Sequence, residues 1–136
     1  MSGILVDSNV LLDLFTEDKK WLNWSSRQIA QAAERGPLVI NSIIYSEVSV
    51  GFEKFETLEA KLRPDIFERR GIPWEAAFLA GKCFFRYRKL GGSKTSPLPD
   101  FYIGAHAAVE NLTLLTRDQR RYRTYFPKLK MITPEL

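Results

Sequence analysis

The 136-residue sequence predicts an α/β domain in which helices cover both faces of a short parallel sheet. Three short apolar runs, at residues 4–6, 38–40 and 112–115, have the length and composition of buried strands. Longer segments with a helical spacing of apolar residues separate these runs. Strands that alternate with helices pair in parallel, so we expect three layers with a short central sheet.

The first half of the chain shows this alternation twice. The strand at 4–6 ends on Asp7 and leads into a helix that extends to Phe15. A second helix is expected over residues 20–35, where Gly36 followed by a proline ends it. After the strand at 38–40, Asn41 is a suitable N-cap for a helix that runs to about residue 52.

The second half contains longer helical segments. Two helices are expected around residues 53–70 and 73–90, with a break at 71–73, and residues 91–97 form the clearest loop. Pro99 stands at the start of an alanine-rich helix that ends near residue 110. The strand at 112–115 follows, and residues 130–132 are a candidate edge strand. We therefore expect a single domain over residues 1–136.

Composition excludes several classes of protein. With 45% hydrophobic and 26% charged residues, the chain is neither disordered nor collagen-like. Cys83 and His106 are the only residues of their types, so an internal disulfide or a Cys/His zinc site cannot form. The N-terminus does not resemble a signal peptide, and no apolar stretch approaches the roughly 20 residues that span a bilayer. We expect a cytoplasmic protein without a membrane segment.

Four acidic residues are placed where ligands bind in parallel sheets, near the carboxyl ends of the strands. Asp7 follows the first strand, Asp118 follows the strand at 112–115, and Asp100 lies in the first turn of a helix. Glu47 falls on or beside the apolar stripe of its helix. Three of them have a structural alternative, since Asp7 and Asp100 are also suitable helix caps and Asp118 is a suitable turn residue.

The surroundings of Asp100 favour an open site. Gly104 and Ala107 share its helix face, which predicts a shallow, open strip beside the carboxylate.

Two carboxylates about 4 Å apart repel by roughly 4 kcal/mol at an effective dielectric of about 20, so a cluster of four needs protons or a divalent cation. An oxygen-only cluster suits Mg²⁺ or Mn²⁺, which can activate water against a phosphodiester.

Four segments of the sequence resemble those of a known family. The segments Val6-Asp7-Ser8-Asn9-Val10-Leu11, Ser46-Glu47-Val48, Pro99-Asp100-Phe101-Tyr102-Ile103-Gly104-Ala105-His106-Ala107 and Leu115-Thr116-Arg117-Asp118 are similar, in this order, to PIN domains. Length and spacing resemble VapC toxins of toxin–antitoxin modules. The resemblance implies a PIN-like three-layer α/β/α fold and a magnesium-dependent endoribonuclease that forms a homodimer and is inhibited by a cognate antitoxin.

The resemblance also implies roles for individual residues. Asp7 and Asp100 match the principal metal ligands, and Glu47 and Asp118 match the remaining acids of the site, which together form the expected catalytic quartet. The supporting polar positions correspond to Asn9 and Thr116.

Basic and aromatic residues flank the acids in sequence. With a net charge of +4, the chain is compatible with a polyanionic partner. Arg86, Arg88, Lys94 and Arg117 are candidate RNA contacts, although each also fits a solvated basic helix face or loop. Four tyrosines in the same segments, at positions 87, 102, 122 and 125, could stack on unpaired bases.

Two other classes of function compete with the nuclease. A receiver-like phosphoacceptor domain has a similar size and also binds magnesium, but it needs an aspartate where Asn41 stands and a pair of acids after the first strand. A catalytically silent PIN-like domain that only binds RNA would be favoured by the loss of an acid, and all four acids are present. We expect His106 to be structural, because it points to a different helix face from Asp100.

Overall fold

Five short parallel strands form the centre of the part of the chain that the computed structural model describes, residues 3–92 and 98–134. They are β1 (Ile4–Val6), β2 (Leu38–Ile40), β3 (Phe67–Arg69), β4 (Thr113–Leu115) and β5 (Met131–Ile132). Their order in the sheet is β3-β2-β1-β4-β5, and every pairing is parallel. The strand that ends on Asp7 therefore lies at the middle of the sheet.

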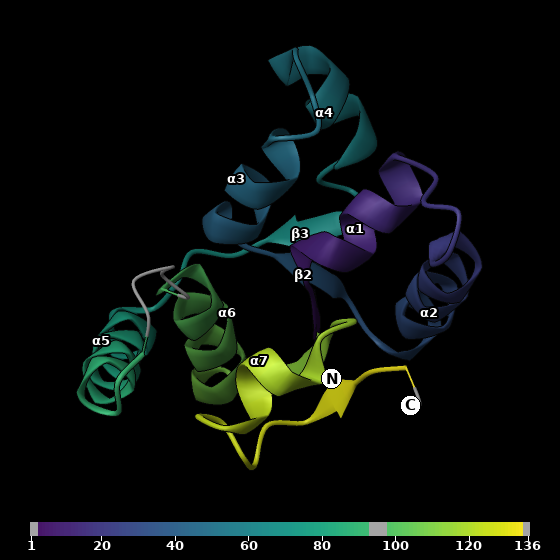
Figure 1. Cartoon of the computed structure of the whole chain (residues 1–136). Coiled ribbons are helices and arrows are strands. Elements are labelled where there is room, and N and C mark those ends of the chain that lie inside the picture. The colour runs from purple at the N-terminus through teal and green to yellow at the C-terminus, as the bar shows by residue number, and fades with distance from the viewer. Residues whose placement is uncertain (1–2, 93–97, 135–136) are drawn as a thin grey trace.

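Helices make every connection between the strands (Figure 1). They are α1 (Ser8–Phe15), α2 (Leu22–Arg35), α3 (Ser42–Ser49), α4 (Phe55–Lys61), α5 (Trp74–Lys89), α6 (Leu98–Val109) and α7 (Gln119–Arg123). Helix α1 packs against α2, α5 packs against α6, and α3 contacts both α1 and α6. Figure 1 shows α2 on one side of the strands and α5 and α6 on the other. The predicted three-layer α/β/α fold is confirmed.

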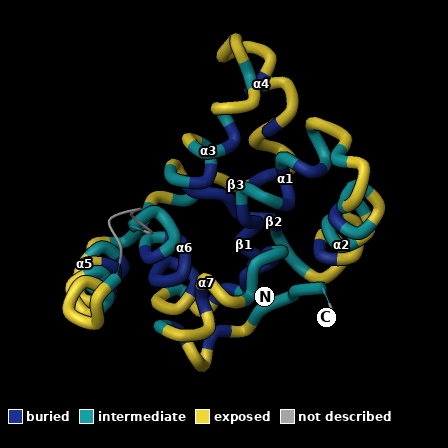
Figure 2. Tube along the Cα trace, in the orientation of Figure 1, coloured by how far each residue is buried: buried dark blue, intermediate teal, exposed yellow. Residues whose placement is uncertain are grey.

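The core lies between the strands and the helices on both faces. Leu5, Val6, Val39 and Leu114 are completely buried, as expected for strands of a parallel sheet that is covered on both sides. Figure 2 shows many exposed residues on α4, on α5 and on the outer side of α2, whereas the strands are largely buried. None of the helices in the described ranges is long and apolar enough to cross a membrane.

The predicted helix over residues 53–70 is wrong. Helix α4 ends at Lys61, and the chain then forms β3 at the edge of the sheet. Pro64 explains the end of the helix, because proline lacks an N–H and disfavours helical geometry in the residue before it. Only Phe67 of β3 is buried, since an edge strand packs on fewer neighbours, and this strand consequently lacks the apolar run that marks the others.

The open strip predicted beside Asp100 is also wrong. Gly104 and Ala107 are buried, and the ring of Phe126 packs where a Cβ of Gly104 would stand. The small residue therefore serves core packing. Residues 93–97 of the predicted loop, which include Lys94, lie outside the described residues.

Candidate active site

Asp7 is a buried carboxylate at the carboxyl end of the central strand. One of its oxygens, Oδ1, accepts a hydrogen bond of 2.8 Å from the backbone N–H of Ser8 and so caps α1. The other, Oδ2, accepts hydrogen bonds from the hydroxyls of Thr116 at 2.7 Å and Tyr122 at 2.9 Å. Burial raises the pKa of Asp7 above its usual value, and these hydrogen bonds oppose that rise. The helix cap and the site residue are thus the same side chain.

Thr116 connects the ends of β1 and β4. Its hydroxyl donates to Asp7 and accepts from the Asn9 side-chain amide at 3.3 Å and from the Asp118 backbone N–H at 3.1 Å. A hydroxyl has one donor and two acceptor positions, so its bonding capacity is complete. Asn9 in turn accepts a hydrogen bond of 3.2 Å from the backbone of Arg117. Both supporting residues named from the sequence lie beside Asp7 and orient the loop that carries Asp118.

Glu47 approaches the same edge of the sheet from α3. The Ser8 hydroxyl donates a 2.8 Å hydrogen bond to its Oε1. Burial raises the pKa of Glu47, and the negative charge of Asp7 raises it further, while the Ser8 hydrogen bond lowers it. Ser8 therefore joins two carboxylates whose charges interact.

Arg121 stands between the other two acids. Its Nε lies 2.7 Å from Asp118 Oδ2, and its Nη1 lies 3.8 Å from Asp100 Oδ1. Burial raises the pKa of Asp100 from 3.8 to about 6, and the Arg121 charge acts against this rise. The charges of the other three acids also raise it. The charges of Asp7, Glu47 and Asp118 thus all act on Asp100, and the charge of Asp7 also acts on Glu47.

The donor chemistry of this cluster fits a hard divalent cation. Among the side chains of residues 3–92 and 98–134, no group of three or more His, Cys, Asp and Glu residues is arranged to hold a metal ion as it stands. Mg²⁺ commonly keeps several waters and binds through only one or two carboxylates, so it does not require such a group. Asp7 and Asp100 are the acids at the metal-ligand positions that the resemblance implies, and Arg121 supplies positive charge beside Asp100.

Arg117 has a partner away from the acidic cluster. Its guanidinium forms two hydrogen bonds, of 2.7 and 3.0 Å, with the buried carboxylate of Asp13 and lies over the ring of Trp21. Ser25 donates a third hydrogen bond of 2.7 Å to Asp13. The candidate RNA contact is therefore also the counter-ion of a buried acid.

The other described candidates for RNA contact lie on α5, the helix that packs on α6, which carries Asp100. Arg86 and Arg88 are exposed in the last turn of α5. This part of α5 is held by Phe84 and Tyr87, whose rings pack on Phe101, the residue after Asp100. Arg88 also lies over the ring of Phe84, 5.8 Å from its centroid.

Three important contacts were not predicted from the sequence. Tyr122, a candidate for base stacking, is completely buried and bonds to Asp7, so that expectation is wrong. The bridging role of Ser8 and the ion pair of Arg121 were also missed. Asp118 and Arg121 are three residues apart, a spacing that places them on one side of a helical turn and could have indicated the pair.

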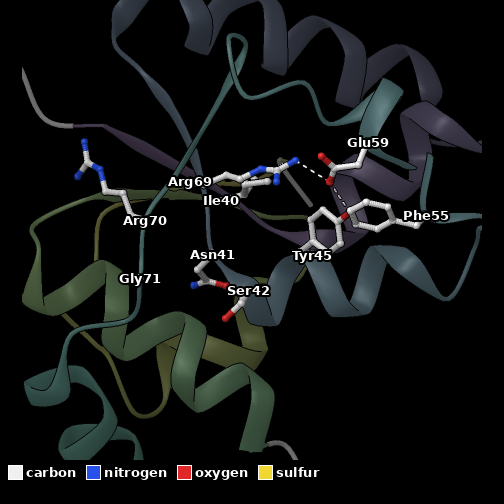
Figure 3. A pocket seen from close by; sticks show the side chains of 9 residues that line it. All are labelled: Ile40, Asn41, Ser42, Tyr45, Phe55, Glu59, Arg69, Arg70 and Gly71. Atoms are coloured by element: carbon white, nitrogen blue, oxygen red, sulfur yellow. Dashed lines mark hydrogen bonds and ion pairs between the residues drawn. The ribbon is translucent and has the colours of Figure 1, made fainter. Parts of the chain in front are cut away.

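A separate pocket of about 380 Å³ opens beside the ends of β2 and β3 (Figure 3). On one side of it the Tyr45 hydroxyl donates a 2.5 Å hydrogen bond to Glu59, and Arg69 lies 2.9 Å from the same carboxylate oxygen. Figure 3 shows this group next to the exposed ring of Phe55. The charges of Arg69 and Glu59 balance, so the pocket is aromatic and close to neutral on this side.

His106 lies behind this pocket in the core. It is completely buried, with Nδ1 2.9 Å from the Asn41 amide and Nε2 3.0 Å from Glu110. Asn41 Oδ1 also caps α3 through the N–H of Ile44 at 2.9 Å. These contacts agree with the structural role expected for His106.

Fold and site together define a small α/β domain with four interacting carboxylates at the carboxyl edge of its sheet. The sheet order differs from the 2-1-3-4-5 order of receiver-like domains. The side chain of Asn41, which stands where a receiver needs its aspartate, caps helix α3. The receiver alternative is therefore wrong. The model of the PIN domain family matches residues 4–127, and the chain belongs to this family. No curated protein matches it in sequence.

Solved structures of similar fold support the assignment. VapBC2 from Rickettsia felis, bound to a promoter DNA fragment, matches with a TM-score of 0.74 and 19% identity, covering 97% of this chain and 98% of that one. VapBC-1 from nontypeable Haemophilus influenzae matches with a TM-score of 0.72 and 19% identity, covering 96% of both chains. A toxin–antitoxin complex from Klebsiella pneumoniae is 27% identical, with a TM-score of 0.66 and 98% of both chains covered.

Proposed function

We propose that the protein is a VapC-type toxin, a metal-dependent endoribonuclease that hydrolyses RNA phosphodiester bonds. The observation that carries this proposal is the arrangement of the four acids at one edge of the sheet, where the charges of Asp7, Glu47 and Asp118 all act on Asp100. Such a cluster is costly in a protein that does not use it, because each buried carboxylate raises the pKa of its neighbours. A divalent cation removes this cost.

In this proposal two of the acids bind the metal ion and the other two orient water. A bound Mg²⁺ or Mn²⁺ supplies an activated water and neutralises charge on the phosphate. Asp7 and Asp100 would hold the ion, and the hydrogen bonds of Thr116 and Tyr122 fix the orientation of Asp7. Ser8 holds one oxygen of Glu47, so that the carboxylate has a fixed direction from which to orient water. Asp118, which follows β4, also orients water.

The partners follow from the same proposal. The substrate is RNA, and the exposed Arg86 and Arg88 in the last turn of α5 are candidate contacts to its backbone. Lys94 and Arg117 remain weaker candidates for the same contact. The similar solved structures from Rickettsia felis and Klebsiella pneumoniae are toxin–antitoxin assemblies, which supports a cognate antitoxin as inhibitor. A cytoplasmic homodimer completes the proposal.

The test uses protein purified free of any antitoxin and incubated with structured RNA in Mg²⁺, in Mn²⁺ and in EDTA. We expect cleavage in either metal, none in EDTA, and a loss of at least 100-fold in Asp100→Asn and Glu47→Gln. The matched control is Asp65→Asn, which removes an exposed carboxylate paired only with Arg63 in the described structure.

Cleavage that persists unchanged in both site variants would contradict the proposal. RNA binding without cleavage by the wild-type protein in any metal would support the silent PIN-like alternative instead. Circular dichroism of each variant establishes that a loss of activity does not come from unfolding.

A further inference from the structure

A small aromatic pocket opens beside Asp100, at the place where three helices meet. Helix α6 packs on both α5 and α7, and Figure 1 shows it between them. The volume of the pocket is about 190 Å³. Its lining includes Tyr87 of α5, Asp100 and Phe101 of α6, Arg120 and Arg121 of α7, and Tyr125, two residues after α7.

Phe101 positions two tyrosine rings as walls of this pocket. Its buried ring lies edge-on against Tyr125, with the centroids 5.0 Å apart, and against Tyr87, with the centroids 5.7 Å apart. The planes of the two tyrosine rings are inclined to each other by 67°. A flat ring system that stacks on one tyrosine therefore presents its edge to the other, and aromatic rings favour both of these arrangements.

The size of the pocket limits what can enter it. Sites that enclose a whole drug-sized ligand measure about 300–1,000 Å³, so a pocket of about 190 Å³ is too small for one. At roughly 30 Å³ per water molecule in the liquid, it has room for about six waters. This volume suits one flat ring system, with any sugar or phosphate attached to it left outside.

The two arginines of the pocket differ in their partners. Arg121 is paired with Asp118 and Asp100. Arg120 is exposed, and its side chain forms no hydrogen bond or ion pair with any residue that the structure describes. A free guanidinium can bind a phosphate through two parallel hydrogen bonds. Aromatic walls and an unpaired arginine together favour a ligand that joins a flat ring to an anion.

The pocket is continuous with the acidic cluster. Asp100 belongs to both, since it lines the pocket and lies 3.8 Å from Arg121, which also pairs with Asp118. A nucleotide chain that has one phosphate at the acids can therefore place a neighbouring base in the pocket. Among the four tyrosines that the sequence offered for stacking on bases, Tyr87 and Tyr125 are the two that line it.

We propose that this pocket binds one unpaired nucleobase of an RNA strand against the rings of Tyr87 and Tyr125, while Arg120 contacts a phosphate of the same strand. The inference rests on the proposed function, because it gives the RNA substrate a contact next to the acids. Paired bases are stacked on one another and cannot enter, so the substrate presents an unpaired segment at this place. Stacking accepts any base, which makes the pocket a site for single-stranded RNA.

The first experiment measures nucleotide binding by NMR titration of the ¹⁵N-labelled protein in EDTA, where no cleavage is expected. The probes are adenosine and uridine 5′-monophosphate, and the reference is ribose 5-phosphate, which has the same phosphate and sugar but no base. The tighter-binding nucleotide should bind at least about tenfold more strongly than ribose 5-phosphate, because the base adds the stacking contact. The signals of Tyr125 and Arg120 should shift with the nucleotide.

The second experiment repeats the titration with variants. Tyr125→Leu should lose the preference for the nucleotide, and Tyr125→Phe should retain it, because the ring is the part that stacks. The matched control is Tyr102→Leu, which removes another half-buried tyrosine from α6 that is not part of the pocket lining and should bind as the wild type does. Arg120→Gln should weaken nucleotide and ribose 5-phosphate by the same factor, since it removes only the contact with the phosphate.

Two of these results do not depend on the leucine variant being folded, namely the comparison of ligands on the wild type and the titration of Arg120→Gln. Equal affinity of the wild type for the nucleotides and for ribose 5-phosphate would overturn the inference. A Tyr125→Leu variant with an unchanged melting temperature and an unchanged preference for the nucleotide would overturn it as well.

RNA cleavage is measured separately in Mg²⁺. Tyr125→Leu should raise KM and leave kcat nearly unchanged, because the lost contact holds the substrate and does not touch the reacting phosphate. A protein that binds nucleotides as expected but cleaves no RNA in any metal contradicts only the nuclease proposal. A protein that cleaves RNA but shows no preference for a base contradicts only the inference about this pocket.

Discussion

The Thr116 hydroxyl donates a 2.7 Å hydrogen bond to Oδ2 of Asp7 and joins two residues that are 109 positions apart in the chain. The ends of β1 and β4 are neighbours in the sheet, which explains how such distant residues meet. The same hydroxyl accepts two further hydrogen bonds, from Asn9 and from the backbone of Asp118.

Replacing Thr116 by valine should therefore destabilise the fold and the site together. The methyl group preserves the volume, but Asp7 loses a donor and two other donors lose their acceptor in a buried place. We expect a loss of about 2–3 kcal/mol in the free energy of unfolding, measured by urea denaturation, and a large loss of cleavage in the folded protein. Thr116→Ser keeps the hydroxyl and should cost less than about 1 kcal/mol. Equal stability of the valine and serine variants would show that these hydrogen bonds contribute little.

Arg121 should compete with divalent cations for the acidic cluster. Its guanidinium forms ion pairs with Asp118 and Asp100, and its charge acts against the raised pKa of Asp100. Arg121→Gln removes this positive charge, so Mn²⁺ should bind several-fold more tightly by isothermal titration calorimetry. Arg120→Gln removes the same charge from an exposed neighbour and serves as the control. Weaker Mn²⁺ binding in Arg121→Gln would show that the arginine orders the carboxylates and does not compete.

Asp100 should make the metal-free protein less stable as the pH rises. Its pKa is raised to about 6 in the folded chain from 3.8, mainly by burial, so the folded state holds its proton more tightly than the unfolded state. The resulting stabilisation is complete below about pH 4 and is lost as the pH rises through 6. One pKa unit corresponds to about 1.4 kcal/mol, and the whole effect is on the order of 1–3 kcal/mol.

The measurement compares melting temperatures of the wild type and Asp100→Asn in EDTA at pH 5 and pH 7.5. The variant should gain on the wild type at the higher pH, because asparagine cannot ionise. A constant difference between the two proteins would mean that Asp100 has the same pKa in the folded and unfolded chains.

Asp13 and Arg117 should behave as a structural pair. Arg117→Met leaves the buried Asp13 carboxylate without its counter-ion, which should cost about 2–3 kcal/mol in the free energy of unfolding. Asp13→Leu/Arg117→Met removes both charges and should recover much of that loss. If the double variant is stable but binds RNA as weakly as the single variant, Arg117 has the additional RNA contact that its sequence position suggested.

Much of the architecture was predictable because local composition determines it. All residues of β1 and β2 and two of the three residues of β4 are buried, and strands that are covered on both faces have a continuous apolar composition. Strand β3 was missed because, at the edge of the sheet, only Phe67 is buried and no apolar run is required. Gly104 was misinterpreted because its small size accommodates a ring from Phe126, which lies far along the chain.

The sequence by itself determined the fold class and that Asp7 and Asp118 follow strands of the sheet, because strand composition and the rule for strand ends depend only on local pattern. Tertiary structure alone decided that Ser8 joins Asp7 to Glu47, that Tyr122 is buried against Asp7 and that Arg121 enters the cluster. These contacts join segments that become neighbours only after the sheet has formed. The spacing of the residues along the chain does not specify the distances between them, and these distances decide how strongly the charged residues shift one another's pKa values.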